Sequence, residues 1–138
     1  MMNLNSNVDV AFMMDATGSM GKHITAVKDG INSIVSRIHD KFKKAKIRVA
    51  FVAYRDYGDG AKHFEILDFT ENIEIFTNFV GRISATGGDD SPEDVLGAID
   101  KTIKLSWKAA NKIFYHAGKS LNSHQSHLGY KNFEILIK

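Results

Sequence analysis

The chain has 138 residues, enough for one domain, and its 43% apolar and 25% charged residues are ordinary values for a globular protein. No apolar stretch approaches the roughly 20 residues of a membrane span, and the first residues lack the basic and apolar regions of a secretory signal. The absence of cysteine excludes a disulfide framework and a thiolate metal site, so we expect a cytoplasmic protein.

Charge is distributed unevenly along the chain. Residues 1–100 hold 11 Lys and Arg against 15 Asp and Glu, whereas residues 101–138 hold 7 Lys and a single acid, Glu134. These lysines are dispersed and lack the interleaved aromatic residues of a base-stacking surface, so the sequence does not favour nucleic-acid binding. We expect one domain over residues 8–117, with residues 118–138 as a divergent basic tail that completes or truncates it.

The first part of the chain alternates strands and helices. Residues 8–14 form an almost continuous apolar run, typical of a strand that is buried on both faces of a parallel sheet. Apolar residues then recur at spacings of three and four from Ile24 to Ile38, which predicts a helix. Residues 47–54 form a second apolar run and predict a second buried strand.

A third, shorter strand is predicted within residues 62–69. The link that precedes it, residues 55–62, contains two Gly and two Asp and is typical of a turn. Because eight residues are too few for a parallel crossover, this strand should pair antiparallel at an edge of the sheet.

Two more helices and a fourth strand follow. Apolar spacing predicts a helix over residues 73–83 and another that ends near Ile103, with Ser91 as its candidate N-cap and Pro92 as its first residue. Residues 111–117 predict the fourth strand. The order of elements predicts an α/β fold with a mostly parallel sheet and one antiparallel edge strand.

Oxygen-bearing side chains follow the first strand at alternate positions, as Asp15, Thr17 and Ser19. Ligands of open α/β sheets bind at the carboxyl ends of the strands, and Mg²⁺ prefers oxygen ligands. One carboxylate and two neutral hydroxyls leave such an ion able to bind an anionic group of a partner. The alternative is that these residues cap the following helix, since Asp, Ser and Thr are preferred N-caps.

The stretch Asp15-Ala16-Thr17-Gly18-Ser19 resembles the metal-ion-dependent adhesion site of the von Willebrand factor type A domain, whose first motif is D-x-S-x-S. Together with "FVAYRDYGD", "ATGGDDSPEDVLGAI" and "LSWK", it resembles the subgroup of these domains associated with alpha-type protein kinases. The resemblance runs from about Val8 to about His116. It implies a doubly wound, mostly parallel, Rossmann-like sheet that is incomplete at its C-terminal end, and a Mg²⁺ or Mn²⁺ ion as cofactor.

The resemblance also implies further metal ligands. In the second loop, Thr86 to Asp90, either Asp89 or Asp90 corresponds to a ligand, and the sequence does not choose between them. Asp56 could approach the same site, although a turn residue is its more common role. A third motif would supply an Asp after the fourth strand, but no acid occurs between Asp100 and Glu134, so we expect a weakened metal site.

We therefore expect a protein-binding module in which the ion bridges to an Asp or Glu carboxylate of a protein partner. The turn after the first strand lacks the paired carboxylates of acid–base catalysis, and "GKHIT" is not a phosphate-binding loop, so we expect no enzymatic activity in this chain. Two alternatives stay open: a regulatory domain or fragment of an alpha-type serine/threonine protein kinase, and a metal-free scaffold or vestigial domain.

Overall fold

The structure is a computed structural model that describes residues 7–87, 94–117 and 133–137. The five strands are β1 Val8–Asp15, β2 Ile47–Tyr54, β3 Phe64–Thr70, β4 Asn111–Ala117 and β5 Phe133–Ile137. The α-helices are α1 Ile24–Lys41, α2 Ile73–Arg82 and α3 Val95–Ile103, and two short 3-10 turns are η1 Gly18–Met20 and η2 Tyr57–Lys62.

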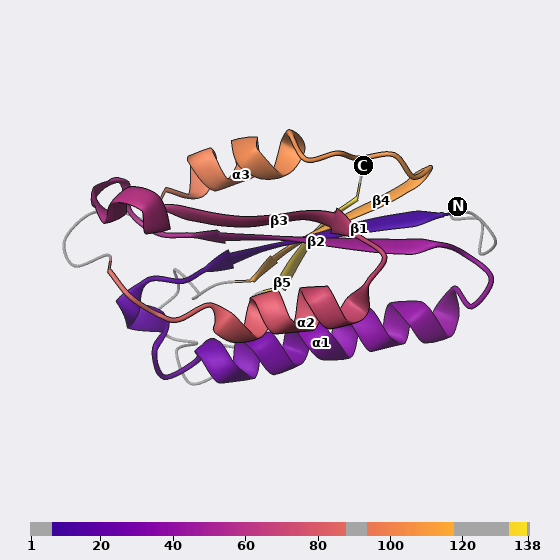
Figure 1. Cartoon of the computed structure of the whole chain (residues 1–138), viewed down its shortest axis with the longest axis horizontal. Helices are drawn as coiled ribbons and strands as arrows, with labels where there is room; N and C mark the ends of the chain where they lie inside the picture. The colour runs from indigo at the N-terminus through magenta and orange to yellow at the C-terminus, as the bar shows by residue number, and fades with distance from the viewer. Residues whose placement is uncertain (1–6, 88–93, 118–132, 138) are drawn as a thin grey trace.

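The strands form one mixed sheet in the order β3-β2-β1-β4-β5 (Figure 1). β1 lies at the centre and pairs in parallel with β2 on one side and with β4 on the other. β3 pairs antiparallel with β2, which confirms the prediction from the short link. β5 pairs antiparallel with β4. The sheet therefore has an antiparallel strand at both edges, whereas the sequence predicted only one such strand, β3.

Helices cover both faces of the sheet. Figure 1 shows α1 and α2 side by side on one face and α3 alone on the other. Since β1 and β2 are flanked by strands on both sides and by helices on both faces, every residue of β1 is buried and only Arg48 of β2 is partly exposed. This burial explains why both strands are nearly continuous apolar runs in the sequence.

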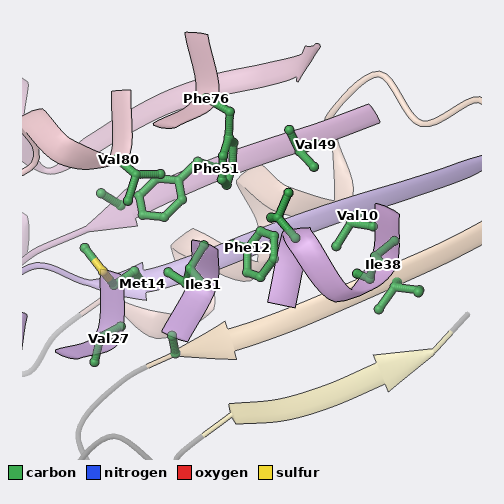
Figure 2. Packing of buried hydrophobic residues seen from close by; sticks show 14 of the residues in the cluster. Val10, Phe12, Met14, Val27, Ile31, Ile38, Val49, Phe51, Phe76 and Val80 are labelled. Carbon is green, nitrogen blue, oxygen red and sulfur yellow. The ribbon is translucent and has the colours of Figure 1, made fainter. Parts of the chain in front are cut away.

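The larger core lies between the sheet and the α1–α2 layer (Figure 2). Phe12 of β1 is fully buried there, with its ring centroid 5.2 Å from that of Tyr115 and 5.7 Å from that of Phe76. Val27, Ile31, Val35 and Ile38 form the buried stripe of α1, as their spacing predicted. This packing fixes the position of α1 and hence of the turn between β1 and α1.

The third helix begins later than the sequence predicted. Its N-cap is Asp94, whose Oδ1 accepts a hydrogen bond of 2.9 Å from the N–H of Gly97. The predicted cap, Ser91, precedes this residue by three positions and lies outside the described residues. Asp94 also bonds through Oδ2 to Nε2 of His63 at 2.8 Å, so a tertiary contact helps to select the cap.

A buried charged cluster closes the end of the sheet where β1 begins. The Asp9 carboxylate is inaccessible to solvent and accepts hydrogen bonds from Nε and Nη2 of Arg48 at 2.8 and 2.7 Å. It also accepts from the N–H groups of Lys108 and Ala109 at 2.7 and 2.9 Å. Asp9 thus joins β1, β2 and the segment that leads into β4.

Among the described helices, none is both long and apolar enough to cross a membrane.

Candidate functional site

The candidate site lies where β1 ends, at the centre of the sheet. From β1 the chain reaches β2 on one side, and β4 later pairs with β1 on the other, which makes the carboxyl end of β1 a topological switch point. Three segments meet there: residues 15–19 at the end of β1, residues 55–59 after β2 and residues 84–87 after α2. We call these three segments the rim.

The three oxygen-bearing residues after β1 form one hydrogen-bonded cluster. Asp15 is 5% exposed, and its Oδ1 accepts from the N–H of Thr17 at 2.9 Å and from Thr17 Oγ1 at 2.6 Å. Thr17 Oγ1 lies 3.2 Å from Ser19 Oγ. Thr17 is buried and Ser19 is exposed, so the cluster runs from the interior to the surface.

Helix capping does not account for this cluster. The N-cap of α1 is His23, and it makes no side-chain capping hydrogen bond. Thr17 precedes η1, but its side chain does not cap that turn either. The alternative that Asp15, Thr17 and Ser19 serve as caps of the following helix is therefore wrong.

The oxygen atoms suit a hard divalent cation. Neighbouring ligands of an octahedral Mg²⁺ at about 2.1 Å stand about 3.0 Å apart, close to the 3.2 Å that separates the two hydroxyl oxygens. A hydroxyl that donates its proton to a carboxylate keeps its lone pairs for a metal. The chemistry and spacing of these donors therefore fit the ion that the resemblance implies.

Residues 84–87, which we call the second rim loop, are held directly against residues 15–19. The N–H of Thr86 donates to the carbonyl of Ala16 at 3.0 Å, and the N–H of Gly18 donates to the carbonyl of Gly87 at 2.9 Å. This pairing brings the start of the predicted Thr86–Asp90 ligand segment to the cluster around Asp15. Asp89 and Asp90 themselves lie outside the described residues, so their role stays a prediction.

Gly87 can be replaced by no other residue without strain. Its φ is +73°, and a Cβ built there would lie 2.3 Å from Oδ1 of Asp59. The Asp59 carboxylate, which the sequence did not single out, therefore lies directly against Gly87 of the second rim loop. Asp59 Oδ2 also accepts a hydrogen bond of 2.8 Å from the N–H of Asp56, which is the N-cap of η2.

Other acids gather near the rim. Asp15, Asp56 and Asp94 are all nearly buried, although carboxylates are rarely buried without a structural or functional reason. Within the described residues, no group of three or more His, Asp or Glu side chains is arranged to hold a metal. Beside the Asp15 carboxylate, the described part of the rim offers the hydroxyl oxygens of Thr17 and Ser19.

Arg55, directly after β2, joins several rim segments. Its side chain is 1% exposed, and its guanidinium donates to the carbonyls of Ala16, Lys62 and Ser84 at 3.0, 2.7 and 2.6 Å. It also forms an ion pair of 2.7 Å with Glu65 of β3. No local sequence pattern predicts this role, because the acceptors come from four different segments.

Lys28 of α1 binds the C-terminal end of α2, directly before the second rim loop. Its ammonium donates to the carbonyl of Gly81 at 3.2 Å and to that of Ile83, at the C-terminal end of α2. A cation at this end of a helix satisfies carbonyls that lack helical partners. Burial lowers the pKa of Lys28, consistent with a position between the two helices.

The third motif of the adhesion site, an Asp after the fourth strand, has no counterpart in the sequence that follows β4. This strand ends at Ala117, and His116 bonds through Nε2 to the hydroxyl of Tyr54 at 2.8 Å. The sequence after Ala117 contains no acid before Glu134. Of the three motifs that the resemblance implies, only the first two, at Asp15–Ser19 and Thr86–Asp90, contain candidate carboxylates in this chain.

Comparisons with known proteins show what the chain is similar to. A family model for the von Willebrand factor A domain matches residues 9–118. The chain is 32% identical over 101 residues to the alpha-protein kinase vwkA of Dictyostelium discoideum, an alignment that covers 73% of this chain and 16% of that protein. It is 31% identical over 86 residues to an ariadne-like RING finger protein of Acanthamoeba polyphaga mimivirus, covering 62% of this chain and 8% of that protein. The chain thus spans less than a fifth of the length of each relative.

Proposed function

The chain belongs to the von Willebrand factor A domain family, and on this premise we propose that it binds a protein partner through a Mg²⁺ or Mn²⁺ ion at the rim. The observation that carries the proposal is the cluster of Asp15, Thr17 and Ser19 oxygens at the switch point of the sheet. These three residues and one of Asp89 or Asp90 would hold the ion.

The bound ion would supply a positive charge that attracts an Asp or Glu carboxylate of the partner. The residues of this chain would orient it: the Asp15 carboxylate stabilises the charge, and the neutral hydroxyls leave part of that charge for the partner. The absence of an acid after β4 reduces the number of anionic ligands, so we expect modest metal affinity and a strong dependence on the remaining carboxylates.

Replacing Asp15 with alanine should weaken Mg²⁺ binding by at least about 100-fold, more than the 10–100-fold typical of outer-shell changes, because a direct ligand is lost. Calorimetric titration of the chain with Mg²⁺ measures this. Asp100→Ala is the matched control, since Asp100 is an exposed acid on α3 and its loss should leave the affinity unchanged.

Thermal melts of both variants must show a folded domain for the comparison to hold. Mg²⁺ binding by the wild type that survives in Asp15→Ala would place the ion elsewhere and reject the proposal. An absence of Mg²⁺ binding by the folded wild type would favour the metal-free scaffold instead.

The similarity to the alpha-protein kinase vwkA favours a second, compatible proposal: this domain acts within a longer protein as a regulatory module of an alpha-type kinase. Sequencing the transcript on both sides of the region that encodes the chain tests it. A kinase domain in the same reading frame supports the proposal, and stop codons that bound the region reject it.

A further inference from the structure

The rim has a candidate ion-binding cluster, yet its segments come from distant parts of the chain. Residues 15–19 begin at the last residue of β1, residues 55–59 follow β2 and residues 84–87 follow α2. For such loops to form one site, a rigid element must fix their relative positions, because displacements of about half an ångström already impair a constellation of ligands.

The buried guanidinium of Arg55 contacts all the segments that have to be aligned. Nε donates to the carbonyl of Ala16, next to Asp15, and Nη2 donates to the carbonyl of Ser84, two residues before Thr86. Nη1 donates both to the carbonyl of Lys62 and to Glu65, which anchors the group to η2 and β3.

The main chain of Arg55 extends the same connection. Its N–H donates to the carbonyl of His63 at 2.8 Å, and its own carbonyl accepts from the N–H of Asp94, the cap of α3, at 3.2 Å. One residue therefore joins the ends of β1 and β2, the loop after α2 and the start of α3. A lysine cannot reproduce this, because only a planar guanidinium presents several donors in fixed directions.

We propose that Arg55 is the positioning residue of the rim: its guanidinium holds the loop after β1 and the loop after α2 in the relative geometry that an ion requires. The metal-affinity part of this inference rests on the proposed function. The geometric part does not, since it concerns the hydrogen bonds between the two loops, from Gly18 to Gly87 and from Thr86 to Ala16.

The experiment measures amide hydrogen exchange of the full chain by NMR, together with Mg²⁺ affinity by calorimetry, in Arg55→Lys. The amides of Gly18 and Thr86 should exchange at least about 10-fold faster relative to those of Val10 and Phe12 in β1, because the rim opens locally while the core stays closed. The Mg²⁺ dissociation constant should rise about 10–100-fold, the usual effect of an outer-shell change.

Arg48→Lys is the matched control. Arg48 also lies in a buried cluster, with Asp9 and the carbonyl of Ser106, but at the opposite end of β2. This variant should lower overall stability without changing the exchange of Gly18 and Thr86 relative to the core, and should leave Mg²⁺ affinity unchanged. A merely structural role for Arg55 would give the same pattern as this control.

A milder variant, Glu65→Ala, covers the case in which Arg55→Lys does not fold. It removes the ion pair of Arg55 but keeps the three carbonyl contacts, so exchange at Gly18 and Thr86 should rise by about 3-fold. Unchanged relative exchange in a folded Arg55→Lys, or in Glu65→Ala if the former is unfolded, overturns the inference. Faster exchange with unchanged Mg²⁺ affinity overturns the link between Arg55 and the metal site. A wild type that binds no Mg²⁺ overturns the proposed function, and the exchange data alone then decide whether Arg55 holds the two loops together.

Discussion

Replacing Phe12 with alanine is expected to lower the free energy of unfolding by about 3–5 kcal/mol, the usual cost of truncating a buried aromatic side chain. Phe12 lies at the centre of β1, has no solvent exposure and stacks on Tyr115 of the neighbouring strand. It also packs on Phe76 of α2, so its loss leaves a cavity between the sheet and that helix. Urea unfolding monitored by circular dichroism measures the change.

Leu96→Ala provides the control for this prediction. Leu96 is a large apolar residue on α3, but it is 80% exposed, so its truncation should change stability by no more than about 0.5 kcal/mol. A loss below about 1 kcal/mol in Phe12→Ala, or equal losses in the two variants, would show that the core does not lie where the structure places it.

The second large effect concerns the buried carboxylate of β1. Replacing Asp9 with asparagine should cost about 3 kcal/mol at pH 7, because Arg48 and the N–H groups of Lys108 and Ala109 lose an anionic acceptor. This is the lower end of the range for broken buried pairs, since the Arg48 side chain is 20% exposed and keeps some contact with water.

The effect should depend on pH in a defined direction. Burial acts to raise the pKa of Asp9, but the hydrogen bond from Arg48, those from Ala109 and Lys108 and the charge of Arg48 together hold it below its ordinary value. A depressed pKa in the folded state stabilises the protein fully above the unfolded-state pKa of about 3.9. This contribution is lost as the pH falls below that value and through the folded-state pKa.

Urea unfolding of the wild type and Asp9→Asn between pH 7 and pH 2 tests the expectation. The difference in stability should stay constant down to about pH 5 and shrink at lower pH. The same substitution at Asp100, an exposed acid that pairs with Lys104, should change stability by less than about 1 kcal/mol at every pH. A pH-independent difference for Asp9→Asn would mean that its carboxylate is not the group responsible.

The sequence predicted most of the fold because the relevant signals are local. Continuous apolar runs identified β1 and β2, and the period of α1 identified its buried stripe. The eight-residue link before β3 fixed its direction through chain length alone. The start of α3 was predicted too early, because the local preference for Ser91 and Pro92 carries no information about the bond between Asp94 and His63.

Some residues of the candidate site were predictable from the sequence and others were not. Asp15, Thr17 and Ser19 are neighbours in sequence, so their alternation after a buried strand sufficed to predict their association. Arg55 and Asp59 gave no such signal. Arg55 resembles an ordinary charged residue at a strand end, and its burial results from acceptors as far as 39 residues away in the chain. The Asp59 carboxylate can lie against the loop after α2 only because Gly87 lacks a side chain.

The central claim is that a divalent ion binds at the rim, and paramagnetic Mn²⁺ tests it most directly. Amide signals of a ¹⁵N-labelled chain broaden steeply with proximity to Mn²⁺, so substoichiometric Mn²⁺ should broaden Thr17, Gly18, Thr86 and Gly87 first. Excess Mg²⁺ should restore these signals by competition for the same oxygen ligands.

The amides of Lys108 and Ala109 serve as the internal reference in the same spectrum. They bond to Asp9, which lies about 20 Å along β1 from Asp15, so they should stay sharp. Selective, Mg²⁺-reversible broadening at the rim is the predicted result. Uniform broadening, or broadening centred on other residues, would contradict the account.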